Sequence, residues 1–251
     1  MTIFTISKSF SSSVERTPRV LEIAEGFGLG LTDKQFVVFE NLHVDINQGD
    51  VVYITGQSGS GKSVLLKELM RQMKTADMKV RDLNDIVLEE RPVIELVGAN
   101  TAEATGYLAR AGISDAWIYI RKPSELSDGQ RYRLKLAILM SLEDSDIWVA
   151  DEFGAVLDRV TAKVIAFNTQ KLARSLGKTL MVATTHTDLG EELGPDLTVT
   201  KRFRERVDIV KKPAHEACRI KGSCTYSRSM DQAYPRKCIH CGTVESVRSA
   251  A

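Results

Sequence analysis

The fold is decided by residues 51–63, which read Val-Val-Tyr-Ile-Thr-Gly-Gln-Ser-Gly-Ser-Gly-Lys-Ser. The first five residues are mostly β-branched or aromatic and predict a buried strand. The glycines that follow let the backbone curl, so that its N–H groups point inward at phosphate oxygens. Beyond the stretch, apolar residues recur at helical spacing, at Leu66, Leu69, Met70 and Met73. Strand, glycine-rich turn and helix in this order are the context of a phosphate-binding loop.

The loop predicts a binding site for Mg-ATP, with ATP and Mg²⁺ as cofactors. Lys62 would reach the β and γ phosphates, and the Ser63 hydroxyl would ligate Mg²⁺. The other phosphate contacts would come from Gly56, Ser58, Gly59, Ser60 and Gly61. A chance match in a Gly/Ser-rich turn is the alternative, and the flanking strand and helix argue against it.

An acidic pair follows a second apolar strand, in the stretch Ile147-Trp148-Val149-Ala150-Asp151-Glu152. Asp151 should emerge from the sheet beside the phosphate loop, where it could hold Mg²⁺ directly or through water. Glu152 would then act on the attacking water, as general base or as a positioning group. The alternative is a surface Asp-Glu pair that caps the end of a strand.

A third motif, Leu126-Ser127-Asp128-Gly129-Gln130, lies between these two. A helix is predicted to begin near Gln130, so Ser127 and Gly129 stand at its start. Free N–H groups and a partial positive charge at such a start suit a γ phosphate. Taken alone, Ser127-Asp128 would be an ordinary helix N-cap.

The order of the three motifs resembles that of ATP-binding-cassette (ABC) ATPases over about residues 36–190. The third motif differs from the family signature, Leu-Ser-Gly-Gly-Gln, only at Asp128, which adds a negative charge near the phosphate site. Asp158 matches the aspartate of the family's dimer-contacting loop, and His186 matches its switch histidine at the γ phosphate. The resemblance implies ATP hydrolysis in a homodimer, with each ATP also touched by the signature of the partner chain.

A narrower resemblance is to non-transport ABC-type ATPases of archaea and phages. The stretches that carry it are 51–56, 127–132 and 184–189. Some of those proteins are fused to a predicted acetyltransferase domain, and nothing at the end of this chain looks like that domain.

The chain also departs from transporter ATPases. It has no glutamine between Gln72 and Gln130, although transporter ATPases carry one between the phosphate loop and the signature; Glu95 or Asn100 could take its place. The interval from the phosphate loop to the signature is short by family standards, which implies a shortened helical subdomain. The aromatic residue that stacks on adenine could be Phe27 or Phe36.

Between the motifs, apolar patterning predicts alternating strands and helices. Strands are expected at 36–47, 51–55, 92–97, 147–150 and 180–185, with helices at 101–111, at 131–142 and from Asp158 to Gly177. This alternation predicts an α/β P-loop NTPase whose mostly parallel sheet is covered on both faces.

Charge divides the chain near residue 200. Residues 201–251 contain 12 Lys or Arg and 5 Asp or Glu, whereas residues 1–200 contain 22 and 28. We therefore expect an ATPase domain over 1–199 and a small basic, Cys-rich appendage over 200–251. No apolar run approaches the roughly 20 residues that span a bilayer, and no secretory signal begins the chain. These patterns predict a cytoplasmic protein with no membrane span of its own.

All four cysteines lie in the basic tail, at Cys218, Cys224, Cys238 and Cys241. The tight pair in Cys-Ile-His-Cys-Gly suits zinc, and the four thiolates could complete a tetrahedral site. His215 or His240 could replace one of them. Unliganded or redox-active thiols remain the alternative.

The tail's basic residues, together with Tyr226 and Tyr234, are compatible with a nucleic-acid partner. A solvated face or a docking surface for an acidic protein explains the charge as well. The sequence therefore predicts a soluble ATP hydrolase whose dimer closes around Mg-ATP and whose hydrolysis drives association or dissociation on a nucleic acid or protein complex. Two alternatives remain: the nucleotide-binding subunit of an ABC transporter, and a non-catalytic scaffold clamped by ATP.

Overall fold

The computed structural model describes residues 2–32, 34–202 and 206–212. The strands are β1 Thr2–Ser12, β2 Lys34–Ile46, β3 Val51–Gly56, β4 Val80–Asp82, β5 Ile147–Ala150, β6 Thr179–Thr184, β7 Leu197–Lys201 and β8 Val207–Lys211. The α-helices are α1 Pro18–Phe27, α2 Lys62–Thr75, α3 Thr101–Arg110, α4 Ala116–Tyr119, α5 Asp128–Ser141, α6 Arg159–Ser175 and α7 Gly190–Leu193. Short 3₁₀ turns lie at η1 Leu83–Asp85, η2 Val93–Glu95 and η3 Pro123–Glu125.

The core of the molecule is a six-stranded sheet in the order β4-β5-β6-β3-β7-β8. All neighbouring strands are parallel except β7 and β8, which pair antiparallel. The strands β5 and β6 are buried along their whole length. The prediction of a mostly parallel P-loop sheet is confirmed. The strand β6 lies between β3 and β5. The phosphate loop and the acidic pair therefore leave the sheet at the same end, the carboxyl end of the parallel strands, with one strand between them.

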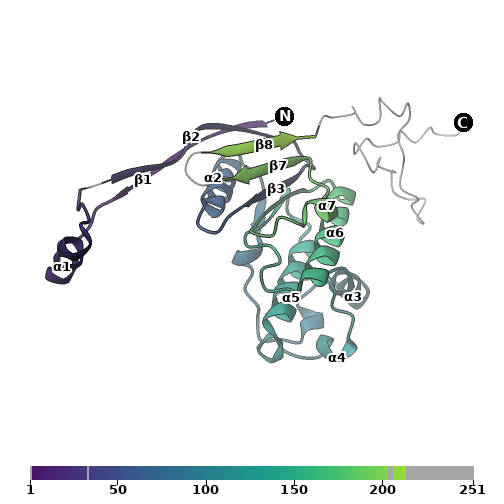
Figure 1. Cartoon of the computed structure of the whole chain (residues 1–251). Helices are drawn as coiled ribbons and strands as arrows, with labels where there is room; N and C mark the ends of the chain where they lie inside the picture. Colours follow the sequence, from purple (N-terminus) through teal and green to yellow (C-terminus); the bar gives the residue numbers. More distant parts are fainter. Residues whose placement is uncertain (1, 33, 203–205, 213–251) are drawn as a thin grey trace, which may run out of the picture.

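Each face of this sheet is covered by its own apolar cluster. On one face α2 and the base of the β1–β2 pair pack together, with Phe4, Phe39 and Leu66 in the interior. On the other face α5, α6 and α7 pack over Trp148 and Phe153. Figure 1 shows α5 and α6 side by side, with α3 and α4 beyond them. These last helices form a small third cluster with Leu134 and Ala137 of α5.

The strands β1 and β2 continue past the body as a long antiparallel arm with α1 at its tip (Figure 1). Thr17 caps α1, and Gly28 ends it in the left-handed conformation, φ 62°. Phe27 is 75% exposed on this helix. The arm therefore carries apolar side chains away from the main core.

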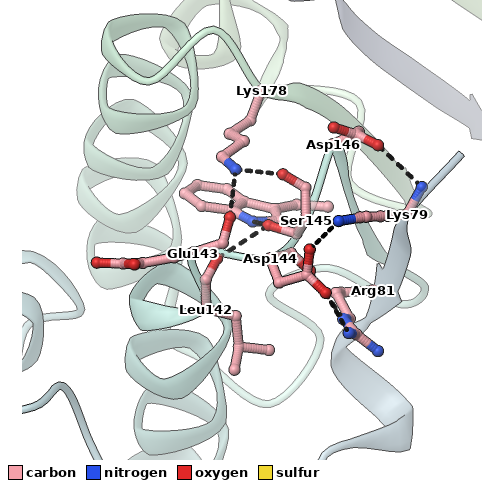
Figure 2. Close-up of polar contacts among 9 residues, drawn as sticks. Lys79, Arg81, Leu142, Glu143, Asp144, Ser145, Asp146 and Lys178 are labelled. Carbon is pink, nitrogen blue, oxygen red and sulfur yellow. Dashed lines mark hydrogen bonds and ion pairs between the residues drawn. The ribbon is translucent and has the colours of Figure 1, made fainter.

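The connection from α5 to β5, residues 142–146, is fixed by two lysines at the amino-terminal edge of the sheet (Figure 2). Lys178 Nζ donates to two backbone carbonyls of the connection, one of them that of Ser145. Lys79 forms an ion pair with Asp144. These contacts fix the point at which β5 begins, and hence where its acidic pair emerges at the other end.

The expected strand at 92–97 is wrong. Residues Val93–Glu95 form the 3₁₀ turn η2, and Val93 and Val97 are buried in the helical cluster rather than in the sheet. A short apolar run has no periodicity that separates a strand from a buried turn. The strand that does precede the helical region is β4, only three residues long.

The predicted boundary at residue 199 falls within β7, and β8 continues the same sheet to Lys211. The proposed division into 1–199 and 200–251 stays a prediction, but the sheet itself extends past it. The cysteines and histidines of the proposed zinc site lie outside the described residues.

Candidate functional site

A cavity of about 520 Å³ lies where β3, β5 and β6 end. The phosphate loop contributes Ser58, Gly59, Gly61, Lys62 and Ser63 to its lining, and the other strands contribute Asp151, Glu152, Thr184 and Thr185. The carboxyl ends of neighbouring parallel strands are a common place for ligands in α/β sheets. Residues predicted for phosphate, metal and water chemistry therefore line one cavity.

The phosphate loop keeps its shape through glycines that no other residue could replace without strain. Gly56 has φ 145°, and a Cβ there would lie 2.0 Å from the backbone oxygen of Lys201. Gly61 has φ 103°, and its Cβ would meet Val38 at 2.9 Å. The loop is thus pressed between β7 and β2, which holds its backbone against the cavity.

Lys62 lies folded back onto its own loop. Its Nζ donates to the carbonyl oxygens of Gly56 at 2.9 Å and Gln57 at 2.7 Å. Burial lowers the pKa of the Lys62 ammonium, and the charges of Asp151 and Glu152 oppose that shift. A partly desolvated cation beside two carboxylates is suited to an anion such as a phosphate group.

Asp151 and Glu152 begin a tight turn after β5. Glu152 has φ 51°, the left-handed conformation that non-glycine residues rarely adopt. Its N–H donates to Asp151 Oδ1 at 3.0 Å, and the next N–H, of Phe153, donates to Ala183 on β6 at 2.9 Å. The turn therefore presents the exposed Glu152 carboxylate to the cavity at the cost of a strained backbone.

The signature residues form the N-terminus of α5. Ser127 is the N-cap, accepting from the Gln130 N–H at 3.3 Å, and Gln130 Oε1 accepts from the Ser127 N–H at 2.9 Å. This capping box uses two N–H groups that the helix leaves without a partner. Asp128, the residue that departs from the family pattern, is paired with Arg131 at 2.6 Å. Its negative charge is therefore compensated within the same turn.

Neither Ser127 nor Gly129 lines the cavity of its own chain. Ser127 is exposed, while a Cβ on Gly129 would lie 3.5 Å from the backbone oxygen of Val156. The start of α5 thus packs on the loop that follows Glu152 and leaves Ser127 open to solvent. A partner chain is required if these residues are to reach a nucleotide.

Asp158 is the N-cap of α6 and is exposed. Its Oδ1 accepts from the Thr161 N–H at 2.9 Å. Hydrogen bonds from the Thr161 side chain and backbone hold the pKa of this carboxyl below its usual range. The aspartate expected in a dimer contact is thus also a helix cap.

His186 is half-buried just past β6 and is not among the residues lining the cavity. Its N–H donates to Thr184 Oγ1 at 3.2 Å, and its carbonyl oxygen accepts from the Tyr53 hydroxyl. Tyr53 lies on β3, so the strand that leads into the phosphate loop also holds the backbone of His186. The assigned roles of His186, Ser127, Gly129 and Asp158 stay predictions.

Three other expectations can be compared with the geometry. Phe27 is the last residue of α1, and Figure 1 shows α1 at the tip of the arm, far from α2, the helix that follows the phosphate loop. Phe36 lies two residues before Val38, which contacts the loop, so it is the better placed of the two for adenine.

The sheet strand before the helical region ends at Asp82 beside β5, whereas Glu95 and Asn100 lie in η2 and before α3. Neither Glu95 nor Asn100 therefore lies at the end of a sheet strand, where the glutamine of transporter ATPases was expected.

The residues present fit Mg-ATP. The Ser60 Oγ is buried without a hydrogen-bond partner among the described residues, and Lys62 is held only by carbonyls that a phosphate could replace. Within the described ranges no three His, Cys, Asp or Glu residues cluster as metal ligands. The Ser63 hydroxyl and the Asp151 carboxylate would hold Mg²⁺, and its remaining ligands would come from phosphates and water.

Sequence reasoning missed several residues that shape the site. The hydroxyl of Tyr132, on α5, accepts from the Gly154 N–H at 3.0 Å, and the hydroxyl of Tyr53 holds His186. Lys201 is buried against Gly56. Tyrosines and lysines within strands and helices carry no motif, so nothing in the pattern marked them.

Comparison with known proteins agrees with this geometry. The family model described as "ABC transporter" matches residues 39–101. The methionine import ATP-binding protein MetN of Clostridium tetani is 28% identical over 189 residues, which cover 62% of this chain and 59% of that protein. The aliphatic sulfonates import ATP-binding protein SsuB 2 of Rhodococcus jostii is 28% identical over 211 residues, covering 76% and 82%. This chain therefore spans less than two thirds of the first relative's length.

Among solved structures, the dimeric post-hydrolysis state of the ATP-binding cassette MJ0796, bound to ADP and Pi, superposes with a TM-score of 0.59. It is 19% identical and covers 84% of this chain. The fold is therefore that of an ABC-type P-loop ATPase domain, and the segment that matches the family model contains the phosphate loop. Among the helices of the described residues, none has the length and apolar character needed to cross a membrane.

Proposed function

We propose that two copies of this chain close head to tail around two Mg-ATP molecules and hydrolyse them. The observation that carries the proposal is the division of the site. Lys62, Ser63, Asp151 and Glu152 meet at one cavity, whereas the signature at Ser127 lies outside it, exposed at the start of α5. A second chain is the natural source of the missing contacts.

In this arrangement each residue has a distinct task. Lys62 leaves the carbonyls of its own loop and neutralises the β and γ phosphates. Ser63 and Asp151 would hold Mg²⁺, and the bound ion would offset the charge that develops during transfer. Glu152 orients the attacking water and accepts its proton. His186 contacts the γ phosphate from the same chain, while Ser127 and Gly129 of the partner contact it from the opposite side.

The first experiment replaces Glu152 by glutamine. Glu152→Gln keeps the size of the side chain but removes the base, so ATP is bound and not consumed. We expect an ATP-dependent dimer that persists in light scattering, with hydrolysis reduced by at least about 100-fold. A Ser127→Arg change in the same background, which blocks the signature, should abolish the dimer. A monomer at saturating Mg-ATP with Glu152→Gln alone would contradict the proposal.

For the partner, we propose a membrane protein that the ATPase serves as a peripheral subunit at the cytoplasmic face. The relatives named above are import ATP-binding proteins, and their similarity supports this choice over a nucleic-acid client. Co-purification of the full chain with a polytopic membrane protein from its native host would support it. ATPase activity that no membrane fraction alters or retains would count against it.

A nucleic acid is the second candidate client. It is favoured by the excess of basic residues after residue 200 and by the absence of glutamine from residues 73–129. It also agrees with the resemblance to non-transport ATPases of archaea and phages. The test is the ATPase rate with single-stranded DNA, duplex DNA and RNA, with zinc quantified in the same sample. Stimulation lost on deletion of residues 213–251 would support it.

Negligible hydrolysis with every client tried would instead favour a scaffold in which ATP acts only as a clamp.

A further inference from the structure

A tyrosine on α5 holds the turn that carries Glu152. The Tyr132 hydroxyl accepts a hydrogen bond from the Gly154 N–H at 3.0 Å. The Tyr132 ring meets the fully buried Phe153 edge to face, with centroids 6.3 Å apart and planes at 75°. Burial raises the pKa of Tyr132 well above its ordinary value, so the hydroxyl stays neutral across physiological pH.

The turn needs such support because its backbone is strained. Glu152 has φ 51°, which costs an L-residue roughly 1–2 kcal/mol. The two N–H groups that follow Glu152 both bond outside the turn. Phe153 donates to Ala183 on β6, and Gly154 donates to Tyr132. One side of the turn is thus fixed to the sheet and the other to α5.

The same helix begins at the signature. Gly129, near the start of α5, approaches the backbone of Val156 in the loop after the turn, at 3.5 Å from its Cβ position. Tyr132 follows one helical turn later and contacts Gly154 and Phe153. The signature and the turn are therefore joined at two points within one chain.

We propose that Tyr132 is a positioning residue for Glu152, which ties the signature end of α5 to the turn that carries the glutamate. The hydroxyl keeps the Glu152 carboxylate aimed at its own cavity. Because the signature faces the partner's nucleotide in the proposed dimer, the same bond makes α5 and the glutamate move together. The coupled movement of α5 and Glu152 rests on the proposed function. The positioning role of Tyr132 requires only that Glu152 acts in hydrolysis.

The test is Tyr132→Phe in the full chain, with steady-state ATP hydrolysis measured well below the melting temperature. Removing the hydroxyl leaves the buried Gly154 N–H without its acceptor, while the ring and its packing stay. We expect kcat to fall about 10-fold and KM for Mg-ATP to change less than about 2-fold, because the phosphate loop is untouched.

Tyr119→Phe is the matched control. Its hydroxyl donates to the Ile113 carbonyl at 3.1 Å, in the helical cluster away from the cavity. The control should lose similar thermal stability and keep its kcat. An unchanged kcat in Tyr132→Phe, or an equal kcat loss in Tyr119→Phe, would overturn the proposal.

Hydrogen exchange gives a second measurement that does not depend on activity. In Tyr132→Phe, amide exchange should accelerate in the peptide that covers residues 152–157 and stay unchanged in α2. Uniform acceleration along the chain would mean a general loss of stability and contradict a positioning role. If Glu152→Gln fails to dimerise while Tyr132→Phe still loses kcat, the positioning role stands and the proposed closure does not.

Discussion

At the level of single residues, the site depends on backbone conformations that few side chains tolerate. Gly56 and Gly61 have φ of 145° and 103° in the phosphate loop, and Glu152 has φ 51° in the acidic turn. The glycines allow the backbone to approach β7 and β2 closely. Glu152 has no such freedom, so its neighbours must hold it by hydrogen bonds. The phosphate loop thus keeps its conformation because its glycines have no side chains, whereas the acidic turn is held by hydrogen bonds from neighbouring elements.

Gly56→Ala should be far more damaging than Gly59→Ala. The new Cβ would lie 2.0 Å from the Lys201 oxygen, so β7 would have to move. We expect the free energy of unfolding to fall by at least about 3 kcal/mol, as strain and overpacking add. At Gly59, φ is 71° but nothing lies within 4 Å of the Cβ position, so only about 1 kcal/mol should be lost. Urea unfolding of both variants compares them, and equal losses would contradict this explanation.

At the level of elements, polar caps place the chemistry. Ser127 begins α5 and Asp158 begins α6, and both are residues for which the family resemblance implies a role at the dimer interface. A cap satisfies N–H groups that a helix leaves without partners. Substitution of either residue therefore disturbs a helix as well as any contact with a partner, and the two effects must be separated.

Asp158→Asn and Asp158→Ala separate them. Asparagine keeps the cap, so α6 should stay stable, whereas alanine loses it and should lower the melting temperature. The depressed pKa of Asp158 adds a pH signature. Its stabilisation is present above the carboxyl's unfolded pKa and is lost as the pH falls through the lower folded value. Melting curves in acid should therefore fall less steeply for Asp158→Asn than for the parent chain. Identical acid slopes would contradict this assignment.

The elements also show what a sequence can and cannot reveal. The strand–loop–helix at residues 51–75 and the strand before Asp151 followed from local patterns, and both are present. The strand at 92–97 failed, because a short apolar run looks alike in a sheet and in a buried turn. The left-handed Glu152 and its link to Tyr132 could not be predicted. They arise from contacts between segments about 20 residues apart, and no local pattern encodes them.

At the level of the whole molecule, the sheet extends further along the chain, to Lys211, than the domain boundary at residue 199 that the charge pattern predicts. The strand β8 pairs with β7 along its length, and the Lys212 N–H donates to the Asp196 carbonyl at 2.8 Å. Lys211 also pairs with Asp45 on β2, at 2.5 Å. The edge of the sheet and the base of the arm are therefore fastened by residues beyond the predicted boundary at 199.

Truncation tests where the ATPase domain ends. A chain ending at Lys212 should retain the melting temperature and the basal ATPase rate of the full chain, because every described strand is kept. A chain ending at Lys201 loses β8 and leaves β7 as an open edge, which favours aggregation. We expect it to be markedly less stable or insoluble. If both truncated chains had the same melting temperature and ATPase rate, the domain boundary would lie near residue 199, as the charge pattern predicts.

The position of β6 between β3 and β5 has a consequence for synthesis of the protein. A nascent chain that has emerged only as far as residue 160 already contains the phosphate loop and the acidic pair, yet it lacks the strand that spaces them. The two motifs can reach their working separation only after residue 184 has left the ribosome. We expect nucleotide binding by ribosome-bound fragments to begin abruptly once residue 184 is outside the ribosome, before the rest of the chain has been synthesised.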